Sequence, residues 1–262
     1  MSIDANGLEA VLKRDRAVVV TGLIAVSALS WLYILAGAGM GGMNGAGIMA
    51  MPASWTAGYT VLMLAMWWVM MVAMMLPSAA PMVLLFAAIT RKDRARGGIH
   101  IPTWVFGAGY LAAWGGFCLG AVALQWGLER LMLLSPMMAI NSVALGGALL
   151  IAAGIYQLTP LKHACLRHCR SPVAYLAYSW RPGRSGAFIM GLRHGIFCLG
   201  CCWVLMALLF YGGVMNLWWI GGLTIYVLIE KLAPAGPFIG RFTGLLLIFW
   251  GLWLLKVFLM DS

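Results

Sequence analysis

Charged side chains are scarce in this sequence. They make up 9% of the 262 residues, and only seven residues are acidic. Soluble domains carry charge on about a quarter of their residues, so this composition excludes an ordinary water-soluble domain. The sequence also has no recognisable glycine-rich phosphate-binding loop, no paired carboxylates in an apolar run and no Ser–His–Asp set. ATP-driven pumping and hydrolysis therefore lack visible machinery, and these motifs give no positive indication of an enzyme.

The sequence consists largely of long apolar runs, and 63% of the residues are hydrophobic. A helix needs about 20 apolar residues to cross a bilayer. The sequence therefore predicts an all-α fold, a polytopic transmembrane helix bundle of about seven spans. The expected spans are residues 17–36, 57–89, 103–127, 138–158, 187–211, 217–229 and 242–259. We expect Pro77 and Pro81 to interrupt the second span, and we interpret Glu230 and Lys231 as anchors at the membrane interface.

Basic residues occur in short blocks between alternate spans, and this pattern predicts the orientation. The blocks lie before the first span and after the second, fourth and sixth spans, whereas the other loops are nearly uncharged. By the positive-inside rule, residues 1–16 form a cytoplasmic N-terminal segment and residues 17–259 form a single transmembrane domain. Loop 37–56 then lies outside and loop 159–186 lies in the cytoplasm. The net charge of +10 indicates contact with the anionic lipid bilayer, and no nucleic-acid partner is expected.

Glycines four residues apart recur in this domain. One pair is Gly116 and Gly120, and a longer series is Gly236, Gly240 and Gly244. Small residues at this spacing let helix backbones approach each other closely inside a membrane. We therefore expect close helix packing at both places.

Cysteine and histidine are concentrated in one part of the chain. Five of the six cysteines and three of the four histidines lie between His163 and Cys202. Soft thiolates and imidazoles gathered beside a membrane helix indicate a thiophilic transition metal or thiol redox chemistry.

The fifth span carries the first of two Cys/His sets. His194, Cys198, Cys201 and Cys202 stand at positions i, i+4, i+7 and i+8. At 3.6 residues per turn, they fall within an arc of about 100° on one helix face. Such a stripe can offer several ligands to one soft ion. It can equally hold a thiol pair that opens and closes, since Cys198 and Cys201 form a CxxC motif.

The second set lies in the loop before that span. Thr159 and Pro160 have the character of a helix N-cap and first helical residue. In the short helix that follows, the residues on one shared face are Cys165, His168 and Cys169, whereas His163 points elsewhere. The neighbouring basic side chains can favour thiolates or bind lipid headgroups. Whether the two sets form one site or two stays open.

Methionines form two further groups. Met40 and Met43 lie in the glycine-rich outer loop. The second group, on the second span, consists of Met63, Met66, Met70 and Met74, within an arc of about 80°. Thioethers suit Cu(I). Methionine also fills irregular cores and packs on aromatic rings, so both groups are open to an ordinary packing role.

Three separated segments resemble a known family. They are the run 70–82, the loop 156–172 and the stretch 191–217 together with 230–232. These segments are similar to the bacterial family of predicted metal-binding integral membrane proteins, long catalogued as a domain of unknown function. The resemblance implies a multi-pass protein of the bacterial inner membrane with a metal site at its histidines and cysteines. It implies no defined reaction.

The leading hypothesis is therefore a membrane protein that binds a soft transition metal, with Cu(I) the best fit. It would transport the ion or deliver it to a metallochaperone or cuproprotein partner. Zinc fits the cysteines and histidines but not the methionines. A second class is a membrane thiol redox protein, or a haem protein with His194 as the best histidine ligand. A third is a non-catalytic subunit that assembles or stabilises a larger membrane complex.

Overall fold

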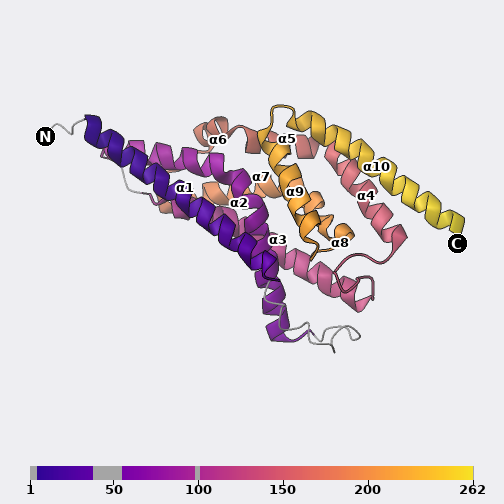
Figure 1. The fold of residues 1–262 in the computed structure, drawn as a ribbon. Coiled ribbons are helices and arrows are strands. Elements are labelled where there is room, and N and C mark those ends of the chain that lie inside the picture. Colours follow the sequence, from indigo (N-terminus) through magenta and orange to yellow (C-terminus); the bar gives the residue numbers. More distant parts are fainter. Residues whose placement is uncertain (1–4, 38–54, 98–100, 262) are drawn as a thin grey trace.

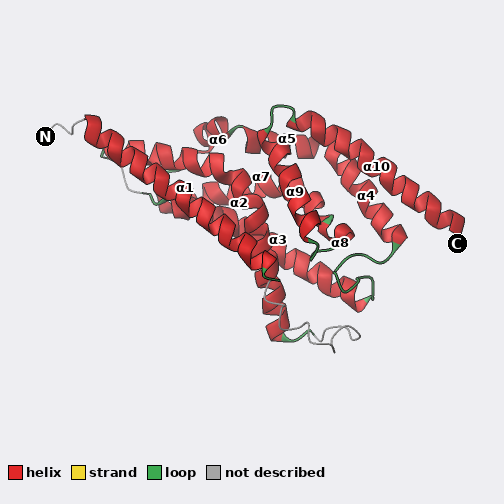
Figure 2. Ribbon diagram, in the orientation of Figure 1, coloured by secondary structure: helices red, strands yellow, loops and turns green. Residues whose placement is uncertain are grey.

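The computed structural model describes residues 5–37, 55–97 and 101–261. Every regular element in these ranges is a helix, apart from one isolated antiparallel bridge between Leu134 and Ile140 (Figure 2). The first five helices are α1 (Ala5–Leu35), α2 (Ala57–Ala95), α3 (Thr103–Arg130), α4 (Val143–Leu158) and α5 (Pro160–Arg170). The others are α6 (Pro172–Ser179), α7 (Gly183–Ala207), α8 (Leu209–Gly212), α9 (Leu217–Leu232) and α10 (Gly236–Asp261). The predicted all-α class is confirmed.

Five helical segments are long and apolar enough to cross a membrane. They are Arg16–Leu35, Ala57–Ala95, Thr103–Arg130, Gly183–Gly212 and Gly236–Met260. Helices α4 and α5 would make a sixth span if they act together, with a bend of 63° between them. Helix α9 has 16 residues and is shorter than the others. A count of about seven spans and a cytoplasmic N-terminus therefore stay predictions.

The prediction that two prolines interrupt the second span is wrong, because the helix is not broken there. Helix α2 continues through Pro77 and Pro81 and extends past Ile89 to Ala95. Proline lacks an N–H donor, so the carbonyls four residues earlier, at Ala73 and Pro77, lose their helical partners. The helix changes direction partway along its length (Figure 1). The prolines thus bend the helix without ending it.

The helix ends follow local capping. The expected fourth span began at residue 138, but α4 begins at Val143 because the Ser142 hydroxyl accepts a hydrogen bond from the Leu145 N–H at 3.3 Å. In the loop 159–186, Thr159 caps α5 in the same way, accepting from the Lys162 N–H at 3.3 Å, and Pro160 is the first helical residue. The short helix expected there is confirmed, and α6 follows it.

The helices pack mainly in pairs. Helix α3 packs along α7, α4 along α10, and α1 along α2, while α5 lies against α7. The α4–α10 pair stands at one side of the molecule, and α1 runs along the opposite side (Figure 1). The apolar side chains of α10 and of Arg16–Leu35 in α1 are mostly exposed, as expected for helices that face lipid. The interior is built by α2, α3, α7 and α9, which carry the candidate site.

Close backbone contact joins α3 to α7. A methyl group added at Gly191 would overlap the backbone carbonyl of Phe106, and one at Gly109 would overlap that of Phe188. Close packing at the Gly236–Gly244 series is confirmed, because Gly244 lies against the backbone of Gly154. The expectation for Gly116 and Gly120 is wrong, because both face outward with open space around them.

This packing gives a prediction for two matched substitutions. Gly191→Ala should lower the free energy of unfolding by about 1–3 kcal/mol, because the new methyl group forces α3 and α7 apart. Gly116→Ala should leave stability unchanged or raise it slightly, because its methyl group meets nothing and alanine favours the helix. Thermal unfolding in detergent, followed by tryptophan fluorescence, compares the two. Equal stability of the two variants would contradict the prediction.

Candidate metal centre

Three thiols lie together on the buried face of α7. The side chains of Cys198, Cys201 and Cys202 are each at most 2% exposed. The thiols of Cys201 and Cys202 both donate to the backbone carbonyl of Cys198, each at 3.0 Å. These contacts turn the two later sulfurs back toward the first. One helix face thus presents three sulfurs within a single turn.

Two more sulfurs reach this face from other helices. Cys169 of α5 places its Sγ 3.9 Å from the Sγ of Cys201. Met75 of α2 places its Sδ 3.9 Å from the Sγ of Cys202. We call Met75, Cys169, Cys198, Cys201 and Cys202 the sulfur cluster. The loop set and the span set are therefore joined through Cys169. Cys165, one turn earlier on α5, lies beside Gly200 of α7.

A lysine ammonium lies within the cluster. Lys231 of α9 is 5% exposed, and its Nζ donates to Cys198 Sγ at 2.9 Å, Ser78 Oγ at 3.3 Å and Met75 Sδ at 3.7 Å. No carboxylate lies within ion-pair distance of this ammonium among the described residues. A buried charge needs a partner, and Cys198 is the one contact that can supply a negative charge as a thiolate. The Tyr110 hydroxyl lies 3.1 Å from the same sulfur.

A second buried charge pair holds the end of α9 in place. The Lys162 ammonium contacts the Glu230 carboxylate and the Gln157 side-chain oxygen, and both charged side chains are almost completely buried. Arg170 of α5 donates to the carbonyls of Glu230 at 2.8 Å and Ala233 at 2.6 Å. These contacts tie α5 to the last turn of α9. They fix the position from which Lys231 reaches the sulfur cluster.

The interpretation of Glu230 and Lys231 as interfacial anchors is wrong, because both side chains are buried and bonded inside the protein. Sequence reasoning also missed Met75 and Tyr110. The sequence feature that could have indicated a buried charged site is the pair of adjacent ionisable residues at the end of an apolar helix. Their orientation depends on α5 and α7, which the sequence pattern alone does not place.

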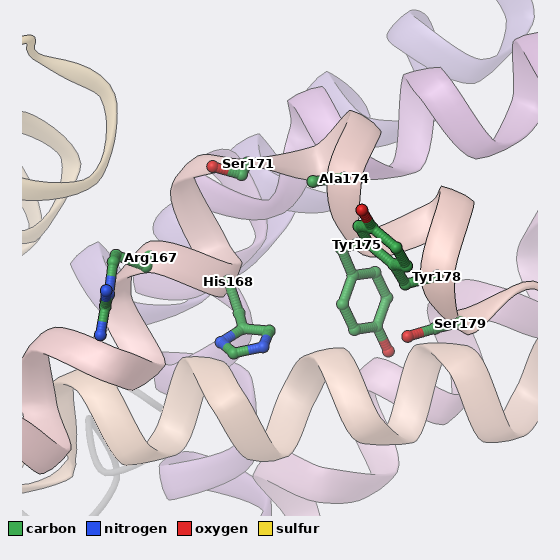
Figure 3. A pocket seen from close by; sticks show the side chains of 7 residues that line it. All are labelled: Arg167, His168, Ser171, Ala174, Tyr175, Tyr178 and Ser179. Carbon is green, nitrogen blue, oxygen red and sulfur yellow. The ribbon is translucent and has the colours of Figure 1, made fainter.

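The three predicted histidine ligands, His163, His168 and His194, lie outside the sulfur cluster. The His194 ring is buried and packs beside the rings of Tyr110 and Tyr175, with centroid distances of 5.7 and 5.5 Å, and its Nδ1 has no hydrogen-bond partner. His168 stacks on Phe197 at 4.1 Å. It also lines a pocket of about 320 Å³ together with Tyr175 (Figure 3). His163 lines a different pocket among arginines. The expected imidazole ligands thus flank the cluster at separate places.

The methionines of α2 extend from the cluster along the helix. Met63, Met66, Met70 and Met74 are all buried. Met66 and Met70 line a cavity of about 100 Å³ with Met215. The sulfur that contacts the cysteines belongs to Met75, the residue after the expected arc. Met40 and Met43 lie outside the described residues.

The candidate ligands are mostly sulfur atoms, and few of them are placed so that they could bind one ion together. Within the described ranges, no three His, Cys, Asp or Glu side chains are placed so that they could hold a metal ion together. Metal–thiolate bonds are about 2.3 Å long for zinc, so one ion can reach two sulfurs up to about 4.6 Å apart. The Cys169–Cys201 pair and the Met75–Cys202 pair, each with its sulfurs 3.9 Å apart, satisfy this limit. The arrangement suits a soft ion held by few sulfur ligands.

The charge pair gives one stability prediction. Glu230→Gln should destabilise the protein by about 3–5 kcal/mol, because it leaves the Lys162 ammonium buried without a counter-charge. The double variant Lys162→Met/Glu230→Leu should cost less than Glu230→Gln, because it removes both charges. Thermal unfolding in detergent measures both variants. A double variant less stable than the single one would contradict this account.

The contact between α5 and α7 gives a second prediction. Diamide treatment of the purified protein should form a Cys169–Cys201 disulfide, because sulfurs 3.9 Å apart need to move by only about 2 Å to bond. Mass spectrometry of proteolytic fragments should detect the linked peptides. Cys118, buried on α3, serves as the internal control and should stay unpaired. Absence of the Cys169–Cys201 link would contradict the joining of the two sets.

Comparison with known proteins gives one family. The sequence model of the PpoB2 family, described as copper chaperone, matches residues 64–254. This range covers well over half of the chain and includes the whole sulfur cluster together with Lys231. No curated protein matches the chain. No solved structure matches it either. Because the family model covers more than half of the chain, the chain belongs to the PpoB2 family, described as copper chaperone.

Proposed function

We propose that this chain is an integral membrane protein that binds Cu(I) at the sulfur cluster and delivers it to a partner cuproprotein. The observation that carries the proposal is the convergence of four thiols and one thioether from α2, α5 and α7. Soft sulfur donors select Cu(I). Membership of a copper-chaperone family supports the same metal and the same task.

The ligand chemistry favours Cu(I) over zinc. Structural zinc sites hold the ion with four ligands, drawn from thiolates, imidazoles and carboxylates. Among the described residues, no three such side chains are placed so that they could hold one metal ion. The Lys231 ammonium also lies 2.9 Å from Cys198 Sγ, and its repulsion penalises a divalent ion more than a monovalent one.

The position of each sulfur-bearing residue suggests its role in binding or transferring the ion. Cys198, Cys202 and Met75 are buried where α2, α7 and α9 meet, and they would hold the ion. Cys201 and Cys169 lead from this set to α5, where Cys165 and Cys169 are partly exposed. The thiols of a partner protein could replace these ligands of the ion one at a time from the α5 side. Transfer by successive ligand exchange keeps the ion bound to sulfur throughout.

The membrane arrangement is part of the proposal. Five long apolar segments, the bent α4–α5 pair and α9 would give seven crossings. By the positive-inside rule, the basic residues of α5 and its flanks support a cytoplasmic position for the partly exposed thiols. We propose the bacterial inner membrane as the location. Delivery would then occur at the cytoplasmic end of the bundle.

A thiol redox protein is the second candidate. The 3.9 Å separation of the Cys169 and Cys201 sulfurs favours it, because this pair can close to a disulfide. A haem protein has weaker support, because the buried histidine, His194, is enclosed by aromatic rings. Measuring the copper content of the purified protein distinguishes these functions from copper binding.

Copper content tests the proposal directly. The purified wild-type protein, loaded with Cu(I), should retain copper after desalting, whereas the triple variant Cys198→Ser/Cys201→Ser/Cys202→Ser should lose it, because serine offers no soft donor. Cys118→Ser is the matched control, since Cys118 is buried on α3 and does not belong to the sulfur cluster. It should retain the wild-type amount. Undiminished copper in the triple variant would overturn the proposal.

A further inference from the structure

A basic pocket lies where α5 meets the first turns of α10, and its volume is about 530 Å³. This volume falls within the range of small-molecule sites, about 300–1,000 Å³. The polar residues that line it are His163, Arg167, Arg170, Ser171 and Arg241, and no acidic side chain of the described residues lines it. The pocket therefore presents positive and neutral groups to whatever enters it.

The positive charge of this pocket is not balanced by nearby carboxylates of the sequence. From residue 130 to residue 260 the chain contains one acidic residue, Glu230. That carboxylate is buried and paired with Lys162. The guanidinium groups of Arg167 and Arg241 have no hydrogen-bond or ion-pair partner among the described residues. An anion in the pocket would therefore meet two arginines with unused donors.

The wall of the pocket is built around Arg170. Its guanidinium donates to four backbone carbonyls at the end of α9 and just after it, at 2.6–3.3 Å. The first turns of α10 pack tightly on the same place. A methyl group added at Gly236 would overlap the Glu230 carbonyl, and one at Gly240 would overlap its carboxylate. This packing holds Arg241, the next residue, beside α5 at the rim of the pocket.

Two helix N-termini add to the positive potential. Helix α5 begins at Pro160 and α10 begins at Gly236, and Pro160 and Pro237 both line the pocket. Each helix N-terminus carries the equivalent of about half a positive charge and favours a bound anion. Arginine binds phosphate through two parallel N–H donors, a geometry that a lysine cannot supply. The chemistry of the lining thus fits a phosphate group.

An apolar stripe leads away from the pocket along α10. It consists of Phe238, Phe242, Leu245 and Phe249, each more than half exposed and together within an arc of about 60°. At 1.5 Å per residue the stripe is about 16 Å long, close to the thickness of about 15 Å of one hydrocarbon leaflet. Helix α10 runs along the outside of the molecule from this end (Figure 1). An acyl chain can therefore lie along α10 while its phosphate occupies the pocket.

We propose that this pocket binds the phosphate of an anionic membrane phospholipid, with Arg167 and Arg241 as its direct contacts. The inference rests on the membrane location proposed above and does not depend on copper. A phosphate held between Arg167 of α5 and Arg241 of α10 joins these two helices. Bound lipid therefore stabilises the end of the bundle from which Cys169 of α5 reaches the sulfur cluster.

Native mass spectrometry of the full-length protein in detergent tests this inference. The protein is mixed with equal amounts of phosphatidylglycerol and phosphatidylcholine, which share a phosphate, although the choline cation of the second is repelled by arginines. Inorganic phosphate is titrated separately. Three forms are compared: the wild type, Arg167→Gln/Arg241→Gln, and the control Arg181→Gln/Arg184→Gln, which removes the same charge from exposed positions outside the pocket.

The wild type and the control should bind phosphatidylglycerol in preference to phosphatidylcholine. Arg167→Gln/Arg241→Gln should bind phosphatidylglycerol at least about tenfold more weakly, because it loses charged hydrogen bonds to the phosphate. Its thermal unfolding without added lipid should match that of the wild type, which shows that it is folded. Equal weakening in the control, or no preference in the wild type, would overturn the lipid site.

Three further outcomes separate this site from its alternatives. Inorganic phosphate that binds as tightly as the lipid would overturn the lipid assignment in favour of a free-phosphate site. Recovery of the wild type in the soluble fraction of cells would overturn the membrane location on which the inference rests. Copper content is measured on the same samples, and Arg167→Gln/Arg241→Gln should keep the wild-type amount. Lipid selectivity without bound copper in the wild type would overturn the copper function and support this site.

Discussion

The contact between the Lys231 ammonium and the Cys198 sulfur organises the interior of this protein. An ammonium buried in a membrane protein is costly unless its charge is compensated. Here its three donors meet a thiol, a hydroxyl and a thioether, contributed by α2 and α7. The contact therefore fixes α9 against both helices at the level of the sulfur cluster. Cys198 is also the one of these three groups that could balance the ammonium charge as a thiolate, the form that binds a soft metal.

The turn that carries Lys231 is held from the other side by Glu230. These neighbours differ in direction by about 100° around α9, so they point to different helices. Glu230 reaches Lys162 on α5, and Arg170 binds the carbonyls at the end of α9. Two adjacent charges thus join α5, which carries Cys169, to α2 and α7, which carry the other sulfurs. The position of each sulfur depends on this pair of contacts.

Part of the fold and of the sulfur cluster could be predicted from the sequence. Apolar runs predicted the helices, and the 3.6-residue period placed Cys198, Cys201 and Cys202 on one face. The Thr159–Pro160 pair predicted the start of α5. Periodicity gives the face of a helix but not the neighbour that it meets, so it does not predict the pairing of Cys169 with Cys201. For the same reason the predicted methionine arc contains Met74 and not Met75, which differs from it in direction by about 100° around α2.

Other features of the interior depend on tertiary contacts that no local pattern encodes. Met138 lies in a loop, and a strained backbone turns it inward to Gln125. His194 shares a helix face with Cys198, yet aromatic rings from α3 and α6 enclose its ring. Thioethers follow the length of α2, and thiols meet between α5 and α7.

X-ray absorption at the copper edge tests the central claim most directly. The full-length protein in detergent, loaded with less than one equivalent of Cu(I), should fill the tightest site first. The account predicts a first coordination shell made of sulfur, because the cluster contains no nitrogen or oxygen ligand on a par with its thiols. A first shell made of nitrogen or oxygen would contradict it.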